Sequence, residues 1–312
     1  MTRTDRTGSR AGRSSTARRR PAVASLLLAF ALMAGACGGA TQETSDATAG
    51  VDPDGEGQRL SIVDVGSGTE TAFTAPEGAS EFDVTLDGSM VAYSDRDENG
   101  DVQVFVMDAD GFNARQLTHG VGGGDYRGPS WSPDGSMIAY GRETSDNSQI
   151  FVVRVSDGVS TRVTSEPNGA VDPGGWTPDG GSIVFSTLDI SIDHYSALSL
   201  DLATGRTRLI VPDGSVPTLS PDGAWIAFNS YHHPEVRLIL ANSDGSKRRI
   251  IARLGSDDGY QRWSPDSTQI AFIGFDEGGF GTYVYDLETG ETRFVTARAI
   301  ESWIDDDHIL VS

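Results

Sequence analysis

A turn phrase of the type Trp-Ser-Pro-Asp-Gly, followed by an apolar strand, recurs along the whole chain. It reads WSPDGSMIAY at 131–140 and WTPDGGSIVF at 176–185, and a second hairpin such as QIFVVRVSDGVSTRVT at 149–164 follows most copies. The aligned acidic residues are 40 to 47 residues apart, at Asp87, Asp134, Asp179, Asp222, Asp266 and Asp306. Two hairpins in a repeat of this length are typical of a propeller blade with four antiparallel strands. The chain is therefore predicted to be an all-β propeller.

The first and last parts of the repeat pattern complete each other. The segment RLSIVDVGSGTETAFT at 59–74 is an outer hairpin with no inner hairpin before it, and ESWIDDDHILVS at 301–312 is an inner hairpin with no outer hairpin after it. Pairing of the two would make a sixth blade and would leave no exposed sheet edge at the seam. We therefore expect a six-bladed β-propeller, closed by the N-terminal outer hairpin and the C-terminal inner hairpin.

Turn chemistry explains the repeated residues without a catalytic role. Proline fixes φ at the first turn position, aspartate accepts hydrogen bonds from nearby backbone N–H groups, and glycine adopts positive φ. If Asp134 and Asp179 were catalytic, one copy of the motif should differ from the others. The copies instead recur along the whole chain, so we expect both residues to shape turns. Four tryptophans at one equivalent position are expected to pack blade against blade, namely Trp131, Trp176, Trp263 and Trp303.

The repeated WSPDG…IAY phrase and the segment SDRDENGDVQVFVMDADGFNARQLT at 94–118 resemble the PD-type repeats of TolB-type six-bladed propellers. The resemblance extends over about 250 residues. Two copies depart from the pattern, since TLDG at 85–88 lacks the Trp and the Pro, and WIDDD at 303–307 lacks the Pro and the Gly. The resemblance implies a TolB-like fold and a non-catalytic protein of the cell envelope that binds a partner.

The N-terminal segment has the features of an export signal. Seven arginines precede the apolar run AVASLLLAFALMAGA at 22–36, which is too short to span a bilayer comfortably. The only cysteine, Cys37, follows this run in a context that resembles the lipobox of bacterial lipoproteins. That resemblance implies lipidation of Cys37 as the first residue of the mature chain. The arginine triplet could suggest twin-arginine export, but the residues PAV that follow it fit that motif poorly. We therefore expect Sec export.

These observations divide the chain into three parts. We expect a lipoprotein-type signal peptide (1–36), a flexible linker rich in Gly, Ser, Thr and acidic residues (37–57), and a TolB-like propeller (58–312). The linker would hold the propeller at the extracytoplasmic face of the cell membrane, since about twenty flexible residues reach roughly 25 Å.

The charge of the chain limits the kinds of partner. The first 36 residues carry seven Arg and one Asp, so the remaining chain has a net charge of −27. A surface of this charge repels phosphate groups, which excludes nucleic acid as an expected partner. A basic partner or a bound cation is compatible with it. We expect a monomer that binds a protein, peptide or glycan of the cell envelope.

The connections between hairpins vary in length and sequence, unlike the short hairpin turns. We expect these connections to line the mouth of a central channel, where propellers and other rigid scaffolds carry binding sites. Tyrosine and arginine often dominate interface energy. The predicted partner contacts in or beside these loops are Tyr126, Arg127, Tyr231, His232, His233, Tyr260 and Arg262.

No catalytic motif accompanies these loops. The sequence has no G-x-S-x-G elbow and no P-loop. We therefore expect a non-catalytic scaffold without a cofactor. The alternative is a metal-dependent lyase or hydrolase that uses His232, His194 and an aspartate at the channel mouth.

A second metal hypothesis concerns the loop DRDENGD. It matches the first half of a calcium-binding loop at Asp95, Asp97, Asn99 and Gly100. Val106 stands where such a loop needs a bidentate glutamate, so any Ca²⁺ binding is predicted to be weak.

Overall fold

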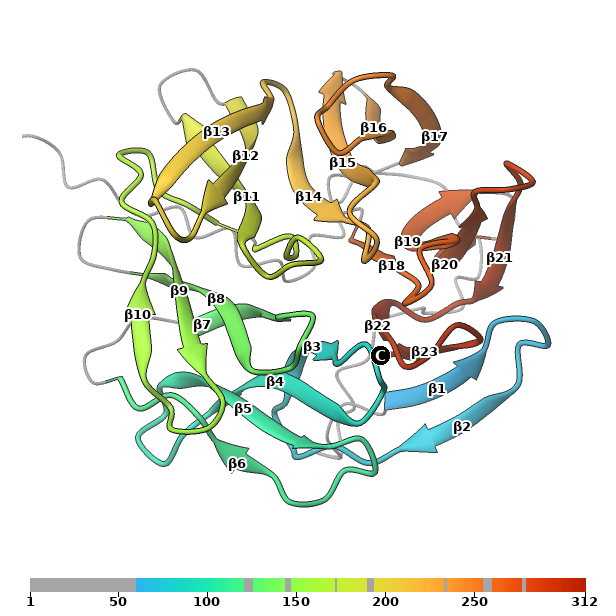
Figure 1. The fold of residues 1–312 in the computed structure, drawn as a ribbon. Coiled ribbons are helices and arrows are strands. Elements are labelled where there is room, and N and C mark those ends of the chain that lie inside the picture. The colour runs from blue at the N-terminus through green and yellow to red at the C-terminus, as the bar shows by residue number, and fades with distance from the viewer. Residues whose placement is uncertain are drawn as a thin grey trace, which may run out of the picture. The chain divides into compact units, whose positions relative to one another are not determined.

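The computed structural model describes residues 60–120, 126–143, 147–171, 173–189, 194–232, 235–254, 260–276 and 279–312. Their strands form six antiparallel sheets arranged as blades around one axis (Figure 1). Among these residues, no helix has the length and the apolar character needed to cross a membrane. The prediction of an all-β, six-bladed propeller is confirmed.

The strands of each blade follow one another outward from the axis. In this order, blade 1 contains β3 (Ser80–Val84), β4 (Met90–Arg96), β5 (Val102–Asp108) and β6 (Arg115–Gln116); blade 2 contains β7 (Tyr126–Trp131), β8 (Met137–Glu143), β9 (Ser148–Arg154) and β10 (Ser160–Arg162). Blade 3 contains β11 (Ser182–Asp189), β12 (His194–Asp201) and β13 (Arg206–Val211); blade 4 contains β14 (Ser215–Leu219), β15 (Trp225–His232), β16 (Glu235–Asn242) and β17 (Arg249–Leu254). Blade 5 contains β18 (Gln261–Trp263), β19 (Gln269–Asp276), β20 (Gly279–Asp286) and β21 (Thr292–Thr296); blade 6 contains β22 (Ile300–Trp303), β23 (His308–Val311), β1 (Leu60–Asp64) and β2 (Glu70–Phe73).

The innermost segment of blade 3 is less regular than that of the other blades. Two isolated bridges stand in place of a strand, from Val171 to Ser186 and from Trp176 to Ile183. Here the carbonyl of Gly174 accepts a hydrogen bond of 2.9 Å from the N–H of Leu219 in blade 4. A Cβ at Gly174 would lie 1.5 Å from the carbonyl oxygen of Pro217. Only glycine therefore permits the backbones of blades 3 and 4 to approach so closely.

Every blade carries its two hairpin turns at the same end. With the bridged segment of blade 3 counted as its first strand, we call the turn between the first and second strands the inner turn, and the turn between the third and fourth strands the outer turn. One backbone hydrogen bond of 2.8–3.0 Å links the two turns in all six blades, from Ala109 to Ser89, Val155 to Ser136, Leu202 to Gly181, Ser243 to Ala224, Leu287 to Thr268 and Val65 to Asp307. This end is the hairpin-turn face. The longer connections lie at the opposite end, the loop-bearing face.

A hydroxyl–carboxylate pair holds most of the inner turns. In blade 2, Ser132 Oγ donates to Asp134 Oδ1 at 2.7 Å, and the same oxygen accepts the N–H of Ser136 at 3.0 Å. The equivalent pairs, at 2.6–2.7 Å, are Thr85–Asp87, Thr177–Asp179, Ser220–Asp222 and Ser264–Asp266. Hydrogen bonds from Ser89 and Thr85 lower the pKa of Asp87 to about 2. The repeated aspartates therefore shape turns, as the sequence predicts.

The inner turn of blade 6 departs from the repeat alignment. The alignment assigns Asp306 to the turn position, but Asp305 Oδ1 accepts the N–H groups of Asp307 and His308, both at 2.9 Å. This turn is one residue shorter than the turn in blade 2, because Trp303 pairs with Ile309 whereas Trp131 pairs with Ile138. Asp306 Oδ1 instead accepts the N–H of Asp266 in blade 5 at 2.9 Å.

The repeated tryptophans join neighbouring blades. Trp131 Nε1 donates to the carbonyl of Asp83 in blade 1 at 3.2 Å. The same bond to the preceding blade occurs from Trp176 to Ser130, from Trp263 to Thr218 and from Trp303 to Arg262, at 3.0–3.1 Å. A buried indole N–H needs such an acceptor. The buried apolar side chains form six clusters, and each cluster draws its residues from two adjacent blades. The core therefore lies between the blades, and the expected packing role of the tryptophans is confirmed.

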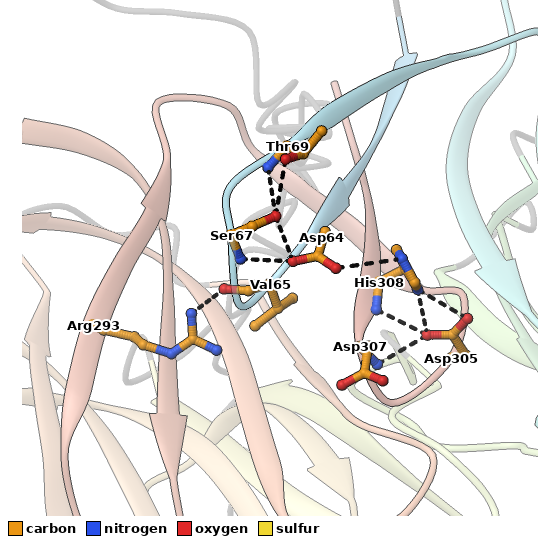
Figure 2. Close-up of polar contacts among 8 residues, drawn as sticks. All are labelled: Asp64, Val65, Ser67, Thr69, Arg293, Asp305, Asp307 and His308. Atoms are coloured by element: carbon orange, nitrogen blue, oxygen red, sulfur yellow. Dashed lines mark hydrogen bonds and ion pairs between the residues drawn. The ribbon is translucent and has the colours of Figure 1, made fainter.

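The ring closes by pairing of the two ends of the propeller. Strand β1 pairs antiparallel with β23, from Ser61 opposite Val311 to Asp64 opposite His308. The predicted closure by the N-terminal outer hairpin and the C-terminal inner hairpin is thus confirmed. Arg293 of blade 5 donates to the carbonyl of Val65 at this seam (Figure 2).

His308 lies between carboxylates from both partners of the seam. Its Nδ1 is 2.8 Å from Asp305 Oδ1, and its Nε2 is 3.7 Å from Asp64 Oδ2 (Figure 2). The hydrogen bond to Asp305, with the negative charges of Asp305, Asp64 and Asp307, raises the pKa of His308 against the opposing effect of burial. The protonated imidazolium therefore bridges the N-terminal and C-terminal hairpins.

We expect the His308→Gln substitution to destabilise the protein in a pH-dependent way. A histidine with a raised pKa in the folded state stabilises that state fully below about pH 6.5, and this contribution disappears as the pH rises through the folded-state value. Urea unfolding at pH 5.5 should show a loss of about 0.5–1 kcal/mol, because the groups are partly exposed. At pH 8.5 the loss should be smaller. The control is His119→Gln, and an equal loss at both pH values would contradict the bridge.

Candidate functional site

The backbone places the predicted partner contacts at the loop-bearing ends of three blades. Tyr126 and Arg127 begin β7, Tyr231 and His232 end β15, and Tyr260 and Arg262 lie at the start of β18. His233 lies outside the described residues, as do the side chains of Tyr126, Arg127, Tyr231 and His232. Their contact roles remain predictions.

Charged side chains from three innermost strands gather near the axis. We call this group the axial cluster: Glu81 and Asp83 on β3, Arg262 on β18, and Glu301 on β22. These strands belong to blades 1, 5 and 6, which are neighbours in the ring (Figure 1). The cluster holds three carboxyl groups for one guanidinium group.

The carboxylates of blade 1 cross to the innermost strand of blade 2. Asp83 Oδ2 accepts the N–H of Trp131 at 2.8 Å, and Glu81 Oε2 accepts the N–H of Gly128 at 3.0 Å. Ser94 Oγ also donates to Glu81 Oε2 at 3.0 Å. An innermost strand has no neighbour on its axial side, so its free N–H groups need other acceptors. These side chains supply them.

Burial raises the pKa of two members of the axial cluster. Burial raises the pKa of Asp83 to about 6, although the N–H of Trp131 and the charge of Arg262 act in the opposite direction. Burial also raises the pKa of Glu301, against hydrogen bonds from Ser312 and the Phe82 backbone and the charge of Arg262. Both residues are partly exposed. The axial cluster thus combines an excess of carboxyl groups over positively charged groups with residues that are not fully buried.

Arg262 is held in place by its neighbours. Its Nε donates to the carbonyl of Glu301 at 3.0 Å, and one terminal nitrogen donates to the carbonyl of Gln261 at 3.2 Å. Its guanidinium carbon lies 5.7 Å from the centre of the Tyr260 ring, within cation–π range. The structure thus brings together two of the predicted contacts.

Beside the axial cluster, a buried acceptor has no hydrogen-bond partner among the described residues. Gln261 is fully buried, and its Nε2 donates to the carbonyl of Val216, but its Oε1 is unpaired. The hydroxyl of Thr218 on β14 is also unpaired. Unpaired buried polar atoms are uncommon in native proteins. They are compatible with a ligand that brings hydrogen-bond donors to the axis.

Sequence reasoning missed the carboxyl members of the axial cluster. Asp83 stands four residues before Asp87, the aligned acidic residue of its repeat, where the other blades have Ser130, Gly175, Thr218, Arg262 and Ser302. Asp83 and Arg262 are charged at a position where the other blades have small residues, and this departure from the repeat is the sequence signal for the site. The variable loops carry the stronger sequence signal, because binding residues often lie in loops.

In the calcium-like loop, the carboxylates of Asp95 and Asp97 accept hydrogen bonds from backbone N–H groups of the loop itself. Asp97 Oδ1 accepts the N–H groups of Asn99 at 2.9 Å and Asp101 at 3.1 Å, and Asp95 Oδ1 accepts the N–H of Arg96 at 2.6 Å. Within the described ranges, no group of three His, Cys, Asp or Glu residues could hold a metal ion. The side chains of His194 and His232 lie outside those ranges, so the transition-metal hypothesis remains untested.

The repeat and the fold have counterparts among known proteins. The family model for the TolB beta propeller domain matches residues 54–262, more than half of the chain. The chain belongs to the TolB β-propeller family. The described ring continues beyond the matched residues to complete blades 5 and 6.

Individual relatives of this TolB-family propeller cover it only in part. An uncharacterized protein of Agrobacterium fabrum is 29% identical over 152 residues, which cover 48% of this chain and 51% of that protein. The Tol-Pal system protein TolB of Xylella fastidiosa is 33% identical over 60 residues, 19% of this chain and 14% of that protein. The chain thus spans about half the length of the first relative and less of the second.

A solved structure from Agrobacterium tumefaciens, described as a TolB, has a similar fold. Its TM-score is 0.67 at 18% sequence identity, and the match covers 81% of this chain and 96% of that chain. At this identity the similarity establishes the fold alone.

We expect Asp83→Asn to make the protein relatively more stable as the pH rises. A carboxyl group with a raised pKa costs stability when it ionises, so the wild type loses stability between about pH 4 and pH 6, whereas asparagine does not. The variant's free energy of unfolding relative to wild type should rise by about 1–2 kcal/mol from pH 4.5 to pH 7.5, allowing for solvent screening. Urea unfolding of both proteins checks this. The control is Asp110→Asn, in the exposed outer turn of the same blade. The prediction would be refuted if the free energy of unfolding of Asp83→Asn changed with pH in parallel with that of the wild type.

Proposed function

We propose that this TolB-family propeller is a non-catalytic scaffold that binds a protein, peptide or glycan of the cell envelope through its loop-bearing face. The observation that carries the proposal is the axial cluster, where three carboxyl groups meet one arginine and two carboxyl groups have raised pKa values. A cationic group would relieve this excess of negative charge. We therefore infer that the partner presents a basic side chain.

The family supports an extracytoplasmic location. One matched relative is a Tol-Pal system protein, and the net charge of −27 after the first 36 residues disfavours nucleic acid as the alternative partner. We further propose that residues 1–36 are a signal peptide, that Cys37 carries lipid, and that residues 37–57 tether the propeller (58–312) to the cell membrane as a monomer. The lipobox-like sequence around Cys37 supports this anchor.

Substitution Cys37→Ser should abolish lipid attachment, because a serine hydroxyl lacks the thiol that receives the lipid. The variant should shift from the membrane fraction to the soluble or uncleaved precursor pool. Metabolic labelling with a radioactive fatty acid, combined with fractionation, measures both effects. Thr41→Ser in the linker is the matched control. Unchanged fatty-acid labelling of the Cys37→Ser variant would rule out the anchor.

Partner binding should depend on the charge of the axial cluster. Glu301→Gln keeps an acceptor for the Phe82 backbone but removes the carboxylate, so affinity for a basic partner should fall by about tenfold. Tyr231→Ala at the loop-bearing end of β15 should also weaken binding. The partner is first captured from envelope extract by reversible crosslinking, and its affinity is then measured by titration with the purified protein. Asp110→Asn on the hairpin-turn face should bind normally.

Two results would contradict the proposal. Equal binding by Glu301→Gln and wild type would exclude the axial cluster as the partner's contact. Retention of about one equivalent of zinc or manganese by the purified protein, lost in His232→Ala, would favour the metal-dependent lyase or hydrolase instead. Inductively coupled plasma mass spectrometry measures that metal content.

A further inference from the structure

Two large aromatic side chains are exposed side by side in blade 5. Phe275 on β19 is 67% exposed, and Phe280 on β20 is 52% exposed. They are direct cross-strand partners, so their side chains project from the same face of the hairpin. Exposed phenylalanines in contact range of each other are unusual on a soluble surface and indicate an interaction site.

The other blades do not repeat this pair at the same register. In blade 5 it lies three residues beyond the pair Phe272–Tyr283. The corresponding pairs are Arg96–Val102 in blade 1 and Glu143–Ser148 in blade 2. Folding of a blade therefore does not require two aromatic residues here.

The aromatic pair lies at the same end of the ring as the beginning of β1. Strand β19 leaves an inner turn at the hairpin-turn face, so Phe275 near its end lies at the loop-bearing face. Ser61 on β1 pairs with Val311 at the end of β23, which places Leu60 at the loop-bearing face too. Blades 5 and 6 are adjacent and share an apolar cluster that includes Ala271 and Val63. Leu60, the first residue of β1, therefore lies at the same face as the aromatic pair and one blade away from it.

We propose that Phe275 and Phe280 insert into the surface of the bilayer that carries the lipid on Cys37. This inference rests on the lipid anchor in the proposed function. Twenty-two residues separate Cys37 from Leu60, and a flexible tether of that length has a root-mean-square reach of roughly 25 Å. The anchor thus keeps the face that bears the pair within reach of the bilayer. A bilayer interface is a surface that takes up exposed phenylalanines.

Tethering and charge together define when the contact forms. The chain that follows residue 36 has a net charge of −27, so two phenylalanines are insufficient to hold it on a membrane without a tether. A short tether raises the effective concentration at the surface to about the millimolar range, where weak contacts become populated. The contact therefore orients a protein that is already anchored and does not recruit it.

The test uses single thiols on the lipidated protein in zwitterionic vesicles. Cys37 is the only cysteine, so after lipidation a Phe280→Cys variant has one free thiol for an NBD fluorophore. The matched control is Phe112→Cys, because Phe112 is 69% exposed in the outer turn of blade 1 on the opposite face. NBD at position 280 should be quenched about twofold by lipids with a spin label on the acyl chain, as for a group at the headgroup boundary. NBD at position 112 should be unaffected.

A double variant, flotation with vesicles and quenching by aqueous iodide distinguish the possible outcomes. Adding Phe275→Ser to Phe280→Cys should reduce the quenching, because the remaining phenylalanine of the pair is lost. Equal quenching at positions 280 and 112 in protein that floats with vesicles would overturn the membrane contact and leave the anchor intact. Protection of position 280 from aqueous iodide without lipid quenching would also overturn it, since a protein partner or a second copy would then cover the pair. Protein that carries no lipid and does not float with vesicles would overturn the anchor and the contact together.

Discussion

The pairing of β1 with β23 is the contact on which the rest of the ring depends. Each blade buries its apolar side chains against the next blade, so an unfinished blade 6 would expose apolar surface on blades 1 and 5 together with a sheet edge. Its partners, Leu310 and Ile62, are separated by almost the whole propeller sequence. Closure therefore has a loop-entropy cost that the contacts of the seam must offset. The bridge of His308 to carboxylates of both hairpins stabilises this contact.

A structural need at the axis also creates the candidate site. The innermost strands have N–H groups with no neighbouring strand, and the carboxylates of Asp83 and Glu81 accept hydrogen bonds from them. Carboxylates that satisfy strand edges concentrate negative charge in a poorly solvated place, which raises the pKa of Asp83 and Glu301. Arg262 compensates for only part of this charge. The same groups that complete the inner strands thus carry the excess negative charge on which the proposed cationic partner depends.

The two faces of the ring differ in structure. The hairpin-turn face consists of short turns, and hydroxyl–carboxylate pairs such as Ser132–Asp134 hold most of its inner turns. The opposite face carries the variable connections, the exposed Phe275 and the entry of the chain at Leu60. Anchoring and partner binding on one face would select partners that lie close to the same membrane.

The sequence alone determined the repeating part of this protein: six blades, turns built on aspartate, tryptophans between blades and closure of the ring by both ends. A period of 40 to 47 residues with fixed turn chemistry is a local signal, and local signals can be read without coordinates. The tertiary structure decided what depends on neighbours in space. It assigned the turn of blade 6 to Asp305, because that turn is one residue shorter. It also joined Asp83, Arg262 and Glu301, which are far apart in sequence, around one axis, where burial raises the pKa of Asp83 and Glu301.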